Sequence, residues 1–132
     1  MYMERNLKLV KCSHKYWEFV RLQRMDERNI DGFIKTAPIS PSQQKQYMKK
    51  YCKNYWICLL GYEPVGFIGV IDNDIRVCTK HEFKKKGVGR FMVESIKKIK
   101  PNLVAKIKIE NTASRKLFES CGFKKRFFLY ES

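Results

Sequence analysis

One segment of the chain combines glycines and cations in a pattern that suits an anionic ligand. Residues 84–90 read Lys-Lys-Lys-Gly-Val-Gly-Arg and stand between an expected strand and an expected helix. Because glycine lacks a Cβ, backbone N–H groups near Gly87 and Gly89 can approach a phosphate closely, and the start of a helix adds unpaired donors. The segment therefore predicts a binding site for a phosphorylated ligand.

The glycine spacing does not fit two common nucleotide motifs. A P-loop needs Gly-x4-Gly-Lys-Ser/Thr, and the dinucleotide fingerprint needs a third glycine and an acidic residue about twenty positions later. Neither pattern follows Lys84. Taken alone, the segment could equally be a solvated loop, so its interpretation depends on a second motif.

That second motif follows about twenty residues later. Residues 111–123 read Asn-x-x-Ser-x-x-Leu-Phe-x-x-x-Gly-Phe. Together with the expected strand Ile75–Thr79 and the Lys84-x-x-Gly-x-Gly loop, this closely resembles the GNAT acyltransferase superfamily. The resemblance covers about residues 56–123, with the two motifs in the family's order. It implies an acetyl-CoA-dependent N-acetyltransferase with acetyl-CoA as the acyl donor.

The resemblance places the acetyl-CoA contacts in three parts of the chain. Backbone groups of Val77, Cys78 and Thr79 would bind the pantetheine arm where two strands separate. Asn111 and Ser114 would contact the far end of that arm or the loop that carries it. The loop residues expected to hold the pyrophosphate are Lys84, Lys85, Lys86, Gly87, Val88, Gly89 and Arg90.

Phe118 is the clearest departure from the family pattern. Many members have a tyrosine here that protonates the departing thiolate, and phenylalanine cannot donate a proton. The acid is then another group or solvent, with Tyr130 as a weak candidate. Lys84 also departs from the usual Gln or Arg, because it keeps the charge without the planar fork of arginine.

Acetyl transfer to an amine also needs a group that takes up the amine proton. Asp74 and Asp72, at the start of the strand leading to the loop, are the first candidates for this base, and turn formation is the alternative role for both. Glu110 and His81 come next. No trustworthy Cys–His or Ser–His–Asp arrangement is apparent, which favours direct transfer over an acyl-enzyme.

The charge of the chain bears on the acceptor. The net charge is +15, and residues 80–126, with 15 basic and 4 acidic residues, carry +11 of it. This favours a small amine, such as an amino sugar or a nucleotide-linked amine, that also carries negative charge. Two alternatives remain open: a macromolecular acceptor (a protein amine or a nucleic-acid base), and an acyl-CoA-binding regulator without turnover. The side chains expected at the acceptor are Arg21, Arg24, Phe33 and Arg76, with Tyr47 beside them, and core packing is the alternative role for Phe33 and Tyr47.

Hydrophobic periodicity predicts one domain, residues 1–132, of the α/β class with element order βααβββαβαβ. The expected architecture is a GNAT-like sandwich, a mostly antiparallel mixed sheet flanked by about four helices. Strands are expected at residues 7–12, 55–62, 65–71, 74–79, 103–110 and 127–130, and helices at 14–28, 41–54, 84–100 and 112–121.

Composition sets the remaining expectations. Hydrophobic residues make up 44% of the chain, which is enough for a core and argues against a disordered protein. No apolar run is long enough to cross a bilayer and no signal peptide is apparent, so the protein is expected to be cytoplasmic without a membrane partner. The five scattered cysteines predict reduced thiols and no metal site. A monomer and a homodimer both remain open.

Overall fold

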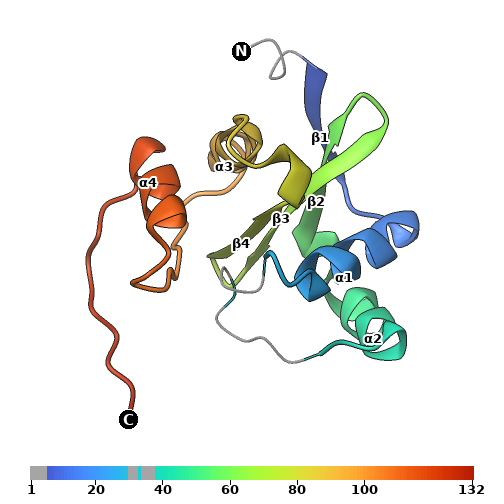
Figure 1. Ribbon diagram of the computed structural model, residues 1–132, viewed down its shortest axis with the longest axis horizontal. Helices are drawn as coiled ribbons and strands as arrows, with labels where there is room; N and C mark the ends of the chain where they lie inside the picture. The colour runs from blue at the N-terminus through green and yellow to red at the C-terminus, as the bar shows by residue number, and fades with distance from the viewer. Residues whose placement is uncertain (1–5, 30–32, 34–37) are drawn as a thin grey trace.

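The computed structural model describes residues 6–29, 33 and 38–132, and it contains a four-stranded antiparallel sheet (Figure 1). The strands lie in the order β1-β2-β3-β4, so each strand pairs with its neighbour in sequence. The predicted strands up to residue 79 are confirmed, with bounds shifted by one or two residues. Their bounds are β1 Leu7–Lys11, β2 Tyr55–Leu60, β3 Glu63–Ile71 and β4 Asp74–Thr79.

Helices lie on both faces of the sheet (Figure 1). The first pair, α1 (Trp17–Met25) and α2 (Pro41–Tyr51), lies on one face. On the other side α3 (Val88–Lys97) packs against the strands, and α4 (Thr112–Ser120) lies beside α3. This is the GNAT-like sandwich that the sequence predicts. Within the part of the chain that the structure describes, no helix has the length and apolar character needed to cross a membrane.

The strands bury side chains on both faces because each face is covered. Successive residues of a strand point to opposite faces, so Ile57, Phe67 and Cys78 form a row beneath α1 and α2. Trp56 and Ile68 lie on the opposite face, in the cluster that packs against α3 and α4. The side chains of β4 alternate in the same way: the even-numbered residues face α1 and α2, and the odd-numbered residues face α3.

The observed starts of the helices match the predicted starts only in part. Ser40 caps α2 in a complete capping box with Gln43, as predicted. The prediction that the first helix starts at His14 is wrong, because residues 14–16 form a 3-10 turn and α1 starts at Trp17. The third helix starts at Val88 rather than Lys84, because the left-handed conformation of Gly87 (φ 87°) directly precedes it.

Two predicted strands are absent from the described residues. Residues 103–110 make only one parallel bridge, between Val104 and Asp74, although Leu103, Ala105 and Ile107 do pack against the core as their alternation indicates. Residues 127–130 form no strand either, and their side chains are exposed. An alternating pattern shows which face is apolar, whereas a strand also needs a neighbouring backbone to pair with. The observed order is therefore βααβββαα.

Candidate active site

β4 pairs with residues 103–110 at one bridge only, which leaves part of its outer edge open. The Ile75 N–H donates to the Val104 carbonyl at 2.9 Å, and the Val104 N–H donates to the Asn73 carbonyl at 2.8 Å. After this bridge residues 105–110 make no further pairing with β4. Because backbone groups alternate along a strand, those of Val77 and Thr79 point to the same open side as the Ile75 N–H. The opening thus presents the backbone groups assigned to the pantetheine arm.

The open edge of β4 leads directly to the start of α3. A 3-10 turn, His81–Phe83, follows the strand, and Lys85 (φ 63°) and Gly87 (φ 87°) both adopt left-handed conformations before the helix. The Phe91 N–H donates to the Gly87 carbonyl at 3.0 Å as the first helical hydrogen bond. The N–H groups of residues 88–90 therefore precede the helical pattern and are the donors that a helix start offers an anion.

The cationic side chains of the loop have different surroundings. Lys84 is half-buried, and its Nζ donates to the Arg28 carbonyl at 3.3 Å. The Lys86 Nζ lies 5.8 Å from the centre of the Phe83 ring. Lys85, Lys86 and Arg90 are exposed, so the mobile charge near the start of α3 comes mainly from these three side chains.

Gly89 and Asn111 bring α4 against this loop. A Cβ on Gly89 would lie 3.2 Å from Leu117 Cδ2 and 3.5 Å from Thr79 Oγ1, so α3 and α4 approach closely here. Asn111 caps α4, with its side-chain oxygen accepting from the Ser114 N–H at 3.0 Å. The Asn-x-x-Ser motif therefore fixes the start of α4 beside the expected cofactor loop.

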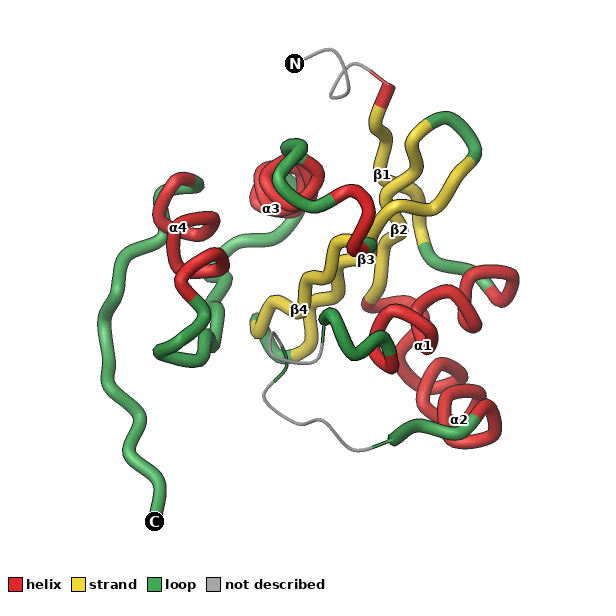
Figure 2. Tube along the Cα trace, in the orientation of Figure 1, coloured by secondary structure: helices red, strands yellow, loops and turns green. Residues whose placement is uncertain are grey.

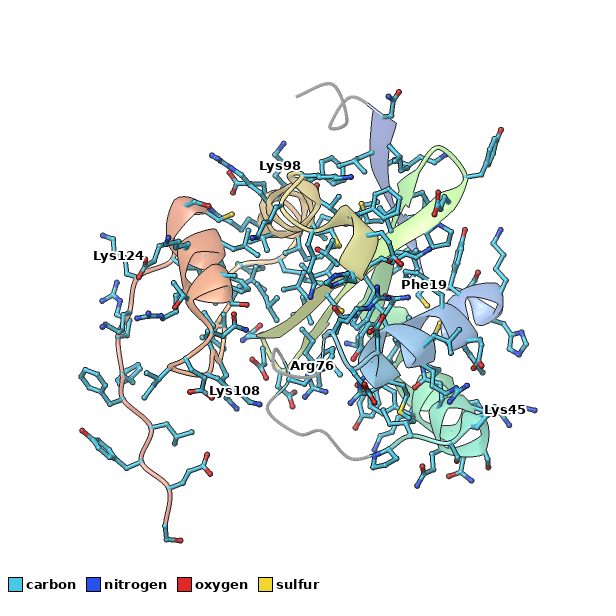
Figure 3. The ribbon with its side chains drawn as sticks, viewed as in Figure 1. Phe19, Lys45, Arg76, Lys98, Lys108 and Lys124 are labelled. Carbon is cyan, nitrogen blue, oxygen red and sulfur yellow. The ribbon has the colours of Figure 1, made fainter. Side chains whose placement is uncertain are left out.

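A cluster of hydroxyl and guanidinium groups lies on the face of β4 that α1 and α2 cover. The hydroxyls of Tyr47 and Tyr55 are 2.7 Å apart, and Arg76 Nη1 donates to the Tyr47 hydroxyl at 3.2 Å. The Arg24 guanidinium lies 5.8 Å from the centre of the Tyr47 ring. Figure 3 labels Arg76 at the end of the sheet. Neither guanidinium forms an ion pair with a described carboxylate.

Gly69 makes room for this cluster. Tyr55, Gly69 and Arg76 are cross-strand neighbours on β2, β3 and β4. A Cβ on Gly69 would lie 2.5 Å from Tyr55 Cε1, which is far inside van der Waals contact. The tyrosine ring therefore lies directly over the glycine and reaches toward the arginine.

We expect Gly69→Ala to displace the Tyr55 ring and to lower the free energy of unfolding by about 1–3 kcal/mol, as overpacking does in a close-packed core. Denaturant unfolding measures this loss. The matched control is the same substitution in a Tyr55→Leu background, where the clash is relieved and a smaller cost is expected. Equal costs in the two backgrounds would contradict the contact.

The other two residues expected at the acceptor, Arg21 and Phe33, do not join the cluster of Arg24 and Arg76. Arg21 is held by Glu18 in a two-point ion pair with contacts of 2.6 and 2.7 Å, and it also donates to the Ile39 carbonyl at 3.1 Å. Phe33 is half-buried and packs with the cluster beneath α1 and α2. Of the four residues expected at the acceptor, the structure thus brings together Arg24 and Arg76.

The candidate acid and base residues are also separated. Asp74 starts β4 on the face of Arg76, and its Oδ1 is buried without a hydrogen-bond partner among the described residues. Asp72 occupies the exposed turn before β4 with φ 51°. Tyr130 is exposed in the C-terminal tail, outside the sheet. Phe118 is 4% exposed, and its ring packs edge-on against Phe123 at 5.1 Å.

Burial keeps the nearest thiol and hydroxyl protonated. Burial raises the pKa of Cys78 to about 12, so this thiol on β4 is a poor nucleophile. Burial, followed by the neighbouring Tyr47 oxygen, raises the pKa of Tyr55 above its usual range. Tyr55 is therefore a hydrogen-bonding group here rather than a base, and direct transfer remains favoured.

Sequence reasoning assigns Tyr55 no role and Tyr47 mainly a packing role. Tyr55 begins an apolar strand, so the sequence pattern predicts only burial. The signal that could have revealed the cluster is the glycine at position 69 within an otherwise apolar strand, since a strand glycine often marks a close approach. Which side chain lies over this glycine depends on the register between β2 and β3.

Comparison with solved structures shows the same fold. Spermidine N-acetyltransferase from Vibrio cholerae, in complex with CoA and spermine, is 15% identical with a TM-score of 0.83, covering 97% of this chain and 86% of that chain. A GNAT-family acetyltransferase from Bacillus anthracis is 18% identical with a TM-score of 0.77, at coverages of 92% and 82%. The Microcin C7 self-immunity acetyltransferase, in complex with acetyl-CoA and AMP, is 16% identical with a TM-score of 0.71, at coverages of 89% and 78%.

Comparison with family descriptions establishes the family. A search of curated protein sequences found no match. Residues 52–125 match the family described as "Acetyltransferase (GNAT) domain", and this range contains β2, β3, β4, the glycine loop and the Asn111 cap. Since the match spans more than half of the chain, the protein belongs to the GNAT acetyltransferase family and is an acetyl-CoA-dependent N-acetyltransferase.

Proposed function

We propose that this enzyme acetylates the amine of a small molecule that also carries a negatively charged group. The observation that supports this most directly is the pair of arginines beside Tyr47, Arg24 and Arg76, which have no carboxylate partner among the described residues. Two cations close to one hydroxyl repel each other, and a bound phosphate or carboxylate offsets that repulsion. An amino sugar phosphate or a nucleotide-linked amine has this chemistry.

The open edge of β4 suits the acetyl donor. Backbone groups of Val77 and Thr79 point into the opening, and the N–H groups of residues 88–90 lie just beyond the strand. A pantetheine arm would extend the sheet through these groups, with the pyrophosphate at the start of α3. Acetyl-CoA, when bound, supplies the thioester that is the source of the acetyl group.

The face of β4 that α1 and α2 cover suits the acceptor. The side chains of Asp74 and Arg76 lie on one face of β4, and the neighbouring residue Val77 offers its backbone groups at the open edge of the same strand. The expected acceptor site and the expected donor site therefore meet on β4. A molecule whose anion is held by Arg24 and Arg76 would have its amine near the start of the strand. Tyr55 and Tyr47 would keep the arginine side chain in place through the hydroxyl contacts described above.

Asp74 is our candidate for the group that takes up the amine proton. Its buried Oδ1 lacks a described hydrogen-bond partner, so it is an acceptor without a donor in the free enzyme. An ammonium group at this position would supply the donor, and loss of its proton to the carboxylate would leave a nucleophilic amine. Phe118 offers no proton for the departing thiolate, which is a good leaving group and would take a proton from solvent.

Asp74→Asn is expected to lower kcat and to remove the acidic limb of the pH–rate profile, because the amide cannot accept the proton. Acetyl-CoA binding should be nearly unchanged. Steady-state rates across pH, combined with calorimetry for the donor, provide the measurement. Asp72→Asn in the exposed turn is the matched control and should leave the profile intact. An unchanged profile for Asp74→Asn would contradict its role and favour Glu110 or His81.

The function itself is tested by a mass-resolved search for acetylated small molecules, proteins and nucleic acids after incubation of the enzyme with acetyl-CoA and a whole cell extract. We expect an anionic amine among the products, and Arg76→Gln should raise its KM at least about tenfold, the scale of one charge-assisted contact. Arg21→Gln is the control, because Glu18 already pairs with that side chain. Acetylation of proteins or nucleic acid alone would favour the macromolecular alternative.

A further inference from the structure

Two of the five cysteines differ from the others in their exposure and in their place in the fold. Cys12 directly follows β1, and Cys52 begins the 3-10 turn that connects α2 to β2. Figure 2 shows β1 running into the loop before α1, and α2 ending at the start of β2. The thiols of Cys12 and Cys52 are half-buried, whereas the other three cysteines are buried. These two are therefore the thiols that a reagent in solution can reach.

The backbone of Tyr55 brings the two residues together. The Cys12 N–H donates to the Tyr55 carbonyl at 3.0 Å, and the Tyr55 N–H donates to the Cys52 carbonyl. A side chain adds a second link between the same segments, because Lys11 Nζ donates to the Lys53 carbonyl at 3.0 Å. The 3-10 turn therefore folds back onto the end of β1.

Both side chains lie on the same face of the sheet. Val10 and Cys12, two positions apart, pack in the cluster beneath α1 and α2, and Cys52 belongs to the same cluster. Burial, followed by the neighbouring Cys52 thiol, raises the pKa of Cys12 to about 12. The two sulfur atoms are thus neighbours, and both are free thiols in this structure.

The surroundings of the two thiols assign them different roles. The Trp17 indole N–H donates to Cys52 Sγ at 3.2 Å, and a donor in this position stabilises negative charge on the sulfur. Lys53 follows Cys52 directly, and no acidic residue lies within three positions of either cysteine. Nearby cations favour a thiolate, whereas Cys12 keeps its proton. Cys52 is therefore the better nucleophile of the two.

We propose that Cys12 and Cys52 form a redox-active pair, which a low-molecular-weight disulfide such as oxidised glutathione converts into a disulfide bond. The Cys52 thiolate attacks one glutathione sulfur, which forms a mixed disulfide and releases the first glutathione as a thiolate that takes up a proton. Cys12 then gives its proton to solvent and attacks the Cys52 sulfur, which forms the protein disulfide and releases the second glutathione. The two protein thiols are oxidised, and the glutathione disulfide is reduced to two thiols.

The bond would tie the end of α2 to the end of β1. It closes a loop of about 40 residues that contains both α1 and α2, and closing a loop of this length restricts the unfolded chain strongly. These helices carry Arg24 and Tyr47, which lie beside Arg76 of β4. Oxidation thus fixes the two helices that cover this face of the sheet, whichever acceptor the enzyme uses.

Oxidation of the reduced full-length protein with glutathione disulfide tests the pair directly. After digestion without reductant, we expect mass spectrometry to find one linked peptide pair that joins Cys12 and Cys52, and dithiothreitol should separate it. Cys52→Ala should abolish the link. Cys121→Ala, which removes a buried thiol, is the matched control and should leave the link intact.

The opposite result has a clear physical meaning. Cysteines whose Cα atoms lie more than about 7 Å apart cannot bridge without movement of the backbone. A wild-type protein that forms only glutathione adducts, or links that involve other cysteines, would therefore overturn the proposal.

The oxidised protein is expected to melt at least about 5 °C above the reduced protein, because the bond restricts the unfolded chain. Thermal unfolding with and without dithiothreitol measures the difference, which should vanish in Cys52→Ala. Equal melting temperatures of the linked and reduced wild-type proteins would overturn the stabilising role of the bond.

Trp17→Phe tests Cys52 as the attacking thiol. The variant keeps an aromatic ring and removes the N–H that donates to Cys52 Sγ. In a Cys12→Ala background, where the mixed disulfide at Cys52 accumulates, we expect Trp17→Phe to slow its formation about fivefold, the scale of one hydrogen bond. An unchanged rate, or faster glutathione addition to Cys12 in Cys52→Ala, would overturn the assigned order of attack.

Discussion

Replacing Gly87 by valine is expected to abolish the rise in melting temperature that acetyl-CoA gives the wild-type enzyme. Gly87 has φ 87° and directly precedes α3, where a β-branched residue is strained and would change the path of the loop. The N–H groups of residues 88–90 would then no longer converge on the pyrophosphate. A ligand at about 100 times its Kd adds about 2.7 kcal/mol to the folded state, so the loss is readily measured.

Gly61→Val is the matched control for this substitution. Gly61 has φ 63° in the β2–β3 turn, and a Cβ there would meet nothing within 4 Å. Both variants are expected to lower the melting temperature of the free protein through backbone strain, but only Gly87→Val should lose the acetyl-CoA shift. NAD and ATP should give much smaller shifts in the wild type. A retained shift in Gly87→Val would show that the phosphates bind elsewhere.

Phe118→Ala is expected to give the largest loss of stability, about 3–5 kcal/mol, because it removes a buried ring and leaves a cavity. The ring belongs to the core cluster that includes Val88, Val93 and Cys121, and it packs edge-on against Phe123. Denaturant unfolding measures the change. Tyr62→Ala is the control, since that ring is 97% exposed and its loss should change the free energy of unfolding by less than about 0.5 kcal/mol.

Phe118→Tyr separates the packing role of this position from an acid role. It keeps the ring and adds one oxygen, so the fold should persist. If solvent protonates the thiolate, the rate should stay equal or rise modestly. A severe loss of rate in a stable variant would show that the ring lies away from the sulfur, and the comparison with the family tyrosine would then be wrong at this position.

The sequence by itself determined the family and the local devices of the fold. The glycine loop, the capping box at Ser40 and the Asn111 cap depend on residues within a few positions of one another, so their spacing is readable directly. The sequence also predicted β2, β3 and β4, since each combines an apolar run with a turn signal. These elements alone locate the expected donor site.

Tertiary structure decided the acceptor face and the fate of the last two predicted strands. The Tyr55–Gly69–Arg76 row exists because of the register of three strands, and a shift of one residue would move every side chain to the other face. Residues 103–110 have the alternation of a strand and residues 127–130 form a continuous apolar run, yet pairing depends on which backbone lies beside them. Alternation is a property of the chain, whereas a hydrogen-bonded neighbour is a property of the folded assembly, so only the structure could decide it.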